Sequence, residues 1–358
     1  MSAWNEEQQL QSKVNIRRWA KVLGFIAVGF TRAQTNYELE IYLKERQDKG
    51  LATPFEPLNH RLRCDPKAVW TECQTVVVLA YPLPLSSPPE KNQGILVRSS
   101  VGEDYHLSVA QRLKLLIQRI MENGWKSAPP KVQVDTGPLN ERALAEQAGI
   151  GWLGRNQQLI VPKHGSFVTL SLLLLDQSFP PDPRVTEQCG GCQNCVQACP
   201  AQLLGGKPFA ARDCLSYLTQ SKEVLTAEQS NKLGRRLFGC DTCQEVCPHN
   251  FLCLKKESEK ASVEPKDWVP ENFPLSKVKL LNYELRRGRD LMEILTLTKR
   301  GFDQSYRPSA AGWRGKSILQ RNAFLALVNA DDGRLKKWLS EHKVVNDLPP
   351  ILLPYLNK

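Results

Sequence analysis

Two cysteine runs in the middle of the chain constrain its fold more than any other feature. In residues 189–199, four cysteines are spaced by two, two and three residues, and proline follows the last one. This spacing is typical of the runs that hold iron–sulfur clusters. A second run, in residues 240–247, repeats the Cys-x2-Cys-x3-Cys-Pro ending. The pattern therefore predicts one-electron redox chemistry.

The second run lacks its first cysteine, because Leu237 stands at that position. Chains with two such runs exchange their fourth cysteines between the clusters. The ligands expected at the first cluster, called cluster site 1, are Cys189, Cys192, Cys195 and Cys247. The ligands expected at the second, called cluster site 2, are Cys199, Cys240, Cys243 and one further cysteine. Cys214, between the runs, is favoured for that place, and Cys253 is the rival.

The alternative for these cysteines is a pair of structural zinc sites. Zinc sites also use Cys-x2-Cys pairs, usually two pairs that are well separated. They do not call for a third cysteine three residues on, or for Cys-Pro twice. The spacing thus favours two [4Fe–4S] clusters over zinc.

Composition limits the class of protein and its compartment. A chain of 358 residues is long enough for two or three domains. The first residues lack the basic and apolar regions of a signal peptide. The apolar run at 167–175 is shorter than the roughly 18 residues of a membrane span. We therefore expect a cytoplasmic protein without a membrane segment, in which Cys64, Cys73 and Cys253 are reduced thiols.

Positive charge is concentrated in one segment. The net charge is +11, and residues 277–321 contain eleven Lys and Arg against four Asp and Glu. A basic patch suggests a polyanionic partner, most plausibly nucleic acid, and the alternative is a solvated basic surface. The residues expected to contact RNA phosphates are Arg286, Arg287, Arg289, Arg314, Lys316 and Arg321.

Hydrophobic periodicity predicts helices at 6–23, 105–122 and 318–328. β-branched and apolar runs predict strands at 25–29, 75–80, 132–134, 158–161 and 167–176. Together they predict an α/β or α+β sheet domain over residues 1–183, ending in a proline-bearing linker at 178–187. The cysteine-bearing domain is expected at 184–255, and a helical domain at 256–358.

Three local features of the sheet domain carry possible chemistry. Residues 149–154 match G-x-G-x-x-G, but they follow a helix and precede a strand, so a tight turn or the close approach of a large ligand is favoured over a dinucleotide site. Asp135 lies at a strand end, where ligands bind in α/β sheets, and the alternative is a helix cap. His106 opens a helix and is either a ligand, a proton donor or a structural residue.

Several segments in order along the chain resemble the epoxyqueuosine reductases. They are Gly102-Glu103-Asp104-Tyr105-His106, Val134-Asp135-Thr136-Gly137-Pro138, Glu141-Arg142-Ala143, the glycine-rich residues 149–156, Cys214-Leu215-Ser216-Tyr217-Leu218-Thr219, and the second cysteine run. The resemblance extends from about Arg63 to Arg321, and the combination is far more specific than any one segment.

The resemblance implies a cytosolic enzyme that reduces epoxyqueuosine to queuosine at the wobble base of tRNA, with two [4Fe–4S] clusters and cobalamin. It implies an α+β, multidomain chain: an α/β cobalamin-binding domain similar to that of reductive dehalogenases, a ferredoxin-like domain, and a short HEAT-like helical domain. It also assigns the eighth cluster ligand to Cys214 and the proton donor to Asp135. The cobalamin contacts that it implies are Arg63, Val97, Asp135, Asp241 and Thr242.

Epoxide removal consumes two electrons and two protons, and an aspartate can hold a proton near neutral pH if burial raises its pKa. As the expected proton donor, Asp135 would need a pKa that burial raises in this way. The expected partners are tRNA and an electron donor such as a flavodoxin or ferredoxin, and the chain is expected to be a monomer. The rivals are a reductive dehalogenase, which would usually carry an export signal, and an RNA-binding electron carrier, which would not need the domain before the cysteines.

Overall fold

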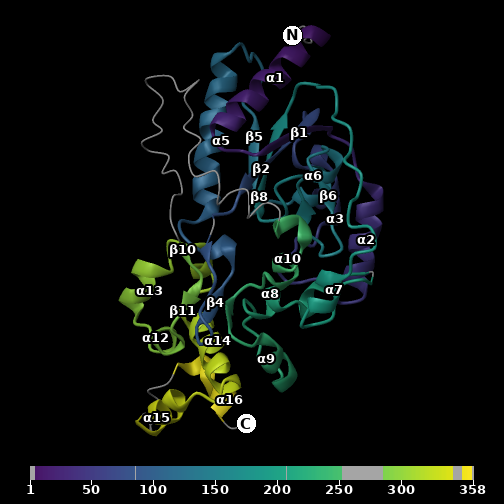
Figure 1. Ribbon diagram of the computed structural model, residues 1–358. Coiled ribbons are helices and arrows are strands. Elements are labelled where there is room, and N and C mark those ends of the chain that lie inside the picture. Colours follow the sequence, from purple (N-terminus) through teal and green to yellow (C-terminus); the bar gives the residue numbers. More distant parts are fainter. Residues whose placement is uncertain (1–4, 85, 207, 252–284, 342–348, 357–358) are drawn as a thin grey trace.

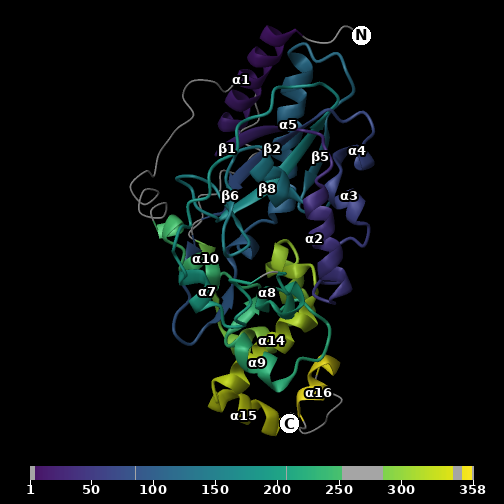
Figure 2. The same ribbon diagram turned by 90° about the vertical axis from the view of Figure 1, so that its right-hand side faces the viewer.

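The computed structural model describes residues 5–84, 86–206, 208–251, 285–341 and 349–356. Figure 1 shows a sheet with its helices at one end, the cysteine-bearing helices beside and below it, and the C-terminal helices at the other end. The view turned by 90° keeps the same order along the long axis (Figure 2). Within these ranges, no helix has the length and apolarity that crossing a membrane requires.

The main sheet has four strands in the order β1-β2-β8-β5, and each neighbouring pair is antiparallel. Its strands are β1 (Ala27–Arg32), β2 (Thr75–Pro82), β8 (Val168–Leu175) and β5 (Lys131–Val134). The α+β prediction is confirmed. The α/β description of this domain is wrong, because the strands of this sheet do not pair in parallel as βαβ units would require.

Both faces of the sheet are covered. Alternate residues of β2 belong to different hydrophobic clusters, as the two-residue period of a strand dictates. Val77 and Leu79 pack with the buried faces of α1 (Glu6–Val22) and α5 (Tyr105–Glu122). Val76 and Val78 pack on the opposite face with residues of α6 (Glu141–Gln147).

The other short elements of this part are α2 (Tyr37–Asp48), α3 (His60–Cys64), α4 (Pro66–Val69), β3 (Ser86–Ser87), β4 (Gly94–Leu96), η1 (Arg98–Ser100), β6 (Trp152–Leu153) and β7 (Leu159–Ile160). The sequence pattern missed α2, because Tyr37 and Ile41 are each 70 % exposed and the helix has no continuous apolar face.

The glycine-rich residues 149–154 allow other backbone segments of the protein to approach closely, and the expected close approach of a large ligand stays a prediction. Gly149 has φ +69, and a Cβ there would collide with the carbonyl of Pro183. A Cβ on Gly151 would collide with the carbonyl of Ile160. These residues lead into the β6–β7 hairpin rather than into a helix.

The cysteine-bearing part is built from short elements: α7 (Asn194–Ala198), η2 (Ala211–Asp213), α8 (Leu215–Leu218), α9 (Ala227–Leu233), β9 (Arg236–Phe238) and α10 (Thr242–Glu245). The C-terminal part contains β10 (Leu285–Arg286), β11 (Gly288–Arg289), α12 (Leu291–Leu295), α13 (Lys299–Ser305), η3 (Ala310–Gly312), α14 (Lys316–Asn329), α15 (Gly333–Glu341), η5 (Pro350–Leu352) and α16 (Leu353–Leu356).

These two parts share one hydrophobic core. Leu237 of β9, Leu291 of α12 and Phe324 of α14 belong to the same buried cluster. A small sheet of order β11-β4-β9 ties the same parts to the N-terminal region. The boundary predicted at 255/256 stays a prediction, but the core continues across it.

Candidate active site and cluster sites

The two sets of thiols expected from the cysteine spacing are brought together. The thiols of cluster site 1 line one small pocket, and they are Cys189, Cys192, Cys195 and Cys247. Burial raises the pKa of the Cys247 thiol, and the nearby thiols of Cys189 and Cys192 add to the rise. Helix α7, which carries Cys195 of the first run, packs against α10 of the second run. This packing brings cysteines from the two runs together.

The thiols of cluster site 2 line a larger cavity, and they are Cys199, Cys214, Cys240 and Cys243. Burial raises the pKa of the Cys214 thiol to about 11, and the nearby Cys240 and Cys199 add to the rise. Cys214 therefore lies in the set for which it was favoured. The rival Cys253 lies outside the described residues, and the role of each thiol as a ligand stays a prediction.

Among the described residues, no group of three or more His, Cys, Asp or Glu side chains is arranged to hold a metal ion. Each thiolate of a [4Fe–4S] cluster binds a different iron atom. The four thiols around a cluster therefore lie farther apart than the ligands of a single metal ion.

Leu237 explains why the second run lacks a cysteine. It lies on β9 and is 0 % exposed within the shared core. The run therefore begins directly after a core strand, and Cys214, which precedes α8, approaches the same cavity from another segment.

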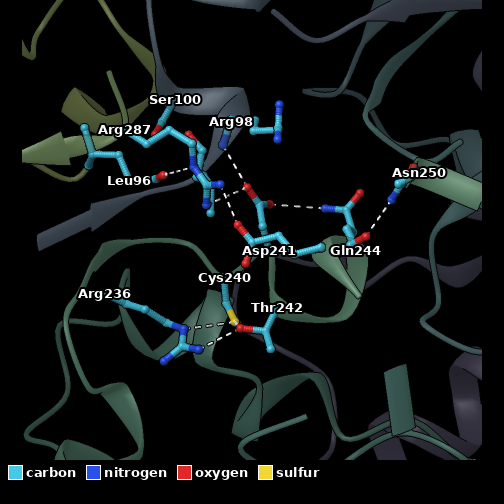
Figure 3. A network of polar contacts seen from close by, with 12 residues as sticks. Leu96, Arg98, Ser100, Arg236, Cys240, Asp241, Thr242, Gln244, Asn250 and Arg287 are labelled. Carbon is cyan, nitrogen blue, oxygen red and sulfur yellow. Dashed lines mark hydrogen bonds and ion pairs between the residues drawn. The ribbon is translucent and has the colours of Figure 1, made fainter. Parts of the chain in front are cut away.

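Arg236 fixes the sulfur of Cys240. Its Nε donates to the Cys240 sulfur at 3.2 Å, and its Nη2 donates to the Thr242 hydroxyl at 2.7 Å (Figure 3). Its Nη1 donates to the carbonyl of Leu233, the last residue of α9. Hydrogen bonds to cluster sulfurs are among the features that set a cluster's reduction potential.

Two cavities meet between the main sheet and cluster site 2. Their volumes are about 400 and about 360 Å³. Both are lined by Ser99, Asp135, Gln158, Asp241 and Gln244, so the two cavities adjoin each other. The structure thus places Asp135 and the four thiols of cluster site 2 on the walls of the same space.

Asp135 follows β5 and faces this space, with its side chain 58 % exposed. The Tyr105 hydroxyl donates to its Oδ2 at 2.7 Å, and Nε2 of His106 lies 3.1 Å from the same oxygen. Nδ1 of His106 lies 2.6 Å from Oδ1 of Asp104. The imidazole therefore bridges two carboxylates, which an imidazolium with two N–H donors does best.

The charges of this group determine where its proton resides. The hydrogen bond from His106 holds the pKa of Asp135 below its usual value, although burial acts against this. Burial alone would lower the pKa of His106, but the carboxylates of Asp104 and Asp135 raise it to about 9. Burial therefore does not raise the pKa of Asp135 overall, and near neutral pH the proton of this group is held by His106; the role of Asp135 as the proton donor stays a prediction.

The backbone at Asp135 is in the left-handed region, with φ +55. Its N–H donates to Oε1 of Glu141 at 2.8 Å, and Gln133 donates to the same oxygen at 3.2 Å. Burial raises the pKa of Glu141 to about 8, and the charge of Asp135 adds to the rise. Glu141, at the start of α6, thus fixes the turn that aims Asp135 into the cavity.

All the residues expected to contact cobalamin line one or both of these adjoining cavities, and they are Arg63, Val97, Asp135, Asp241 and Thr242. The Asp241 carboxylate is 7 % exposed and is already used inside the protein. It accepts from the backbone N–H of Arg98 at 2.9 Å and from Gln244, and Arg287 lies 3.4 Å away (Figure 3).

The structure contradicts the expected contact with RNA phosphates for two of the six residues. Arg321 is 0 % exposed and donates to the carbonyls of Leu218 and Ser221. Arg287 is 3 % exposed, donates to the Leu96 carbonyl, and pairs with Asp241 and Glu245. Both arginines satisfy buried oxygens, so their charges are not available to a phosphate.

The other four expected contacts remain predictions. Arg289, Arg314 and Lys316 are half-buried, and the side chain of Arg286 lies outside what the structure describes. Sequence reasoning also missed Tyr105 and Glu141 as parts of the site. Only the adjacent Asp104 and His106, and the capping pattern around α6, could have pointed to them.

Two family models match this chain. A 4Fe-4S double cluster binding domain matches residues 188–250, and a domain described as Epoxyqueuosine reductase QueG, DUF1730, matches residues 63–136. The first contains all eight cysteines of the two cluster sites, and the second ends just past Asp135. The chain is thus an iron–sulfur protein of the oxidoreductase class.

Full-length comparisons define the family. The epoxyqueuosine reductase of Bacillus cereus is 34 % identical over 326 residues, which cover 89 % of this chain and 80 % of the relative. An epoxyqueuosine reductase structure with a tRNA-Tyr epoxyqueuosine-modified stem loop has a TM-score of 0.78 at 32 % identity, covering 93 % of this chain and 85 % of that chain. This chain belongs to the epoxyqueuosine reductase family.

The Bacillus subtilis enzyme offers a second structural comparison, with its catalytic aspartate loop swung out of the active site. It has a TM-score of 0.79 at 30 % identity and covers 96 % of this chain and 88 % of that chain. The similarity to a reductive dehalogenase, with a TM-score of 0.37 at 12 % identity, is too low to support the expected likeness of the N-terminal domain.

Proposed function

We propose that this protein reduces epoxyqueuosine to queuosine in tRNA. The observation that carries the proposal is the cavity that Asp135 and the thiols of cluster site 2 both line. It brings a source of protons and a source of electrons to one place, and the reaction consumes two of each. Relatives are named epoxyqueuosine reductases, and one related structure contains an epoxyqueuosine-modified tRNA stem loop.

The residues of this space fit cobalamin. The two adjoining cavities have volumes of about 400 and about 360 Å³, and neutral amides at Asn140, Gln158 and Gln244 line them. Amide side chains suit the amide arms of that cofactor, because each amide both donates and accepts. Arg63, Val97 and Thr242 would hold it. Bound there, the cofactor would supply two-electron reduction of the substrate, with the clusters as the source of single electrons.

The protein's own residues handle the protons. His106 holds a proton between Asp104 and Asp135, and Oδ2 of Asp135 lies within hydrogen-bond distance of it. In the proposed step, Asp135 passes this proton to the departing epoxide oxygen, and a second proton from solvent completes water. A catalytic aspartate loop in the Bacillus subtilis enzyme supports placing Asp135 in this role.

The remaining parts of the proposal concern partners. The C-terminal helices α12 to α16 would form a HEAT-like surface for tRNA, using Arg289, Arg314 and Lys316. A flavodoxin or ferredoxin would reduce the clusters, and the protein would act as a cytoplasmic monomer. Each of these follows from the family resemblance and from the net charge of +11.

The proposal is tested by anaerobic purification, metal analysis and a single-turnover assay. The reconstituted protein, with eight iron atoms and one cobalamin per chain, is expected to convert epoxyqueuosine to queuosine in a tRNA anticodon stem loop. The converted nucleoside is measured by mass spectrometry after digestion. No conversion with full cofactor content would refute the proposed function.

The pH profile tests the proton holder. Because the pKa of His106 is raised to about 9, the imidazole is charged below that pH and loses its proton above it. We expect kcat/KM to fall about tenfold per pH unit above about 9. His106→Gln should be slower at neutral pH and should lack this fall.

Other charged groups surround His106, so the profile needs a matched control. Asp104 and Asp135 bond to the imidazole, and Tyr105, Glu141 and Arg142 lie around Asp135. Glu141 has a pKa raised to about 8 and would titrate first. Glu141→Gln removes that titration and keeps an oxygen for the Asp135 N–H, so it should retain the fall near 9. If the fall of kcat/KM above about pH 9 disappears in Glu141→Gln but persists in His106→Gln, the titrating group is Glu141 instead of His106.

A further inference from the structure

An aromatic cluster is assembled from three segments that are far apart in the sequence. Phe55 comes from the loop between α2 and α3, Tyr217 from α8, and Trp313 follows η3. The Phe55 ring centroid lies 5.2 Å from that of Tyr217 and 5.1 Å from that of Trp313, and both pairs meet edge to face. Tyr217 is buried, whereas Phe55 is 41 % and Trp313 54 % exposed. The buried Tyr217 ring therefore supports Phe55, and Phe55 in turn packs against the exposed Trp313.

Polar bonds hold the exposed rings in place. The Trp313 indole N–H donates to the side chain of Gln220 at 2.9 Å. Nε of Arg314 donates to the Gln220 carbonyl at 2.8 Å. The guanidinium carbon of Arg314 lies 5.1 Å from the Phe55 centroid and 4.8 Å from the Trp313 centroid. The cluster therefore presents two rings and a planar cation in a preorganised arrangement.

This surface lies at the edge of the reaction cavity. Phe55 lines the same cavity as Asp135 and Tyr105, and so does the cationic Arg63. A substrate whose reacting group reaches Asp135 therefore has its neighbouring groups close to Phe55. Aromatic side chains beside arginine are the usual platform for unpaired bases, because every base has a π face that stacks on a ring or a guanidinium.

We propose that Phe55, Trp313 and Arg314 form a stacking platform for the unpaired bases next to the reacting nucleoside of the RNA. An enzyme that acts on a base must take it out of the stack, and the bases beside it then lose stacking partners. The platform replaces those partners. It recognises the π faces and the phosphate charge of single-stranded RNA rather than one base sequence. This inference rests on the proposed function, because that function is what makes RNA the substrate.

The test measures RNA binding directly, with an anticodon stem loop that carries epoxyqueuosine as the probe. Stacking on an aromatic side chain contributes about 1–3 kcal/mol per base, so Phe55→Ala and Trp313→Ala should each raise the Kd about 5- to 150-fold. Trp313→Phe keeps a ring and should bind almost as well as the unchanged protein. Leu58→Ala is the matched control, because Leu58 is 80 % exposed in the same loop but has no ring.

Two further measurements separate stacking from charge and from misfolding. The slope of log Kd against log salt should be unchanged in Trp313→Ala and shallower in Arg314→Ala, because only the arginine contacts phosphate charge. Quenching of tryptophan fluorescence by the stem loop should be reduced in Trp313→Phe, which retains the fold and iron content.

The outcomes are distinguishable. Equal Kd values for Trp313→Ala and Leu58→Ala would overturn the platform, even if the protein reduces epoxyqueuosine normally. If the unchanged protein fails to reduce epoxyqueuosine but binds the stem loop in a Trp313-dependent way, the proposed function fails and the platform stands. An apolar protein partner instead of RNA would be indicated if the ring variants leave RNA binding intact.

Discussion

Replacing Asp135 with asparagine is expected to slow single-turnover reduction of epoxyqueuosine by about 10²- to 10⁴-fold, which is the usual contribution of general acid catalysis. Asparagine has nearly the same shape, but it cannot accept a proton from His106 and pass it on. It also tolerates the left-handed φ of +55 at this position better than most residues do. The turn that aims the side chain into the cavity should therefore survive.

The rate is measured anaerobically with fully loaded protein, and cofactor content and Kd for the stem loop are measured on the same sample. Both should match the unchanged protein. A rate close to that of the unchanged protein would remove Asp135 from the mechanism. Loss of cobalamin would make it a binding residue and would contradict its role as an acid. Asp104→Asn is the matched control, because it changes the partner of the other imidazole nitrogen of His106, and it should reduce the rate less than Asp135→Asn. Since the Asp104 carboxylate raises the pKa of His106, the fall of activity at high pH should begin at a lower pH in this variant.

Cys214→Ala is expected to lose about half of the eight iron atoms and all epoxyqueuosine reduction. Cys214 lies with Cys199, Cys240 and Cys243 on the wall of the reaction cavity, so its loss would leave three ligands for cluster site 2. Cluster site 1 has its four thiols in a separate pocket and should stay loaded. Iron and sulfide analysis and the electron paramagnetic resonance spectrum of the reduced protein measure the result.

Two other cysteines serve as controls for this variant. Cys73→Ala removes a thiol that is 0 % exposed in the core of the sheet domain and should keep all iron. Cys253→Ala tests the rival ligand and should also keep all iron. Half of the iron lost from Cys253→Ala, with none lost from Cys214→Ala, would reverse the assignment.

The local elements were predictable where one segment carries its own pattern. The helix expected at 6–23 is α1, the helix expected at 105–122 is α5, and the strand expected at 75–80 is β2. One face of α5 is buried at helical spacing, and β2 is buried on both faces, so the apolar pattern of each is strong. In α1 only Ile16, Trp19 and Ala20 continue the pattern into the core, whereas Leu10 and Val14 are exposed. The helix α2 was not predictable, since its exposed apolar residues follow no such period.

The charge of a segment did not predict which of its arginines face solvent. Arg287 and Arg321 belong to the most basic segment, yet they bind carbonyls and carboxylates inside the shared core. Net charge counts every arginine equally, whereas burial depends on oxygens contributed by β4, α8 and α10. Arg314 is the contrasting case, because its neighbours are exposed rings at the edge of a cavity.

By itself, the sequence determined the two cysteine runs, the gap at Leu237, the basic segment and the ordered motifs of the family. These are matters of residue type and spacing, which folding does not alter. Only the tertiary structure decided that Asp104 and His106 at the start of α5 meet Asp135 at the end of β5, and that the proton resides on His106 rather than on Asp135. A pKa depends on the burial and the charges around a group, and here those come from segments about 30 residues apart that meet only in the folded chain.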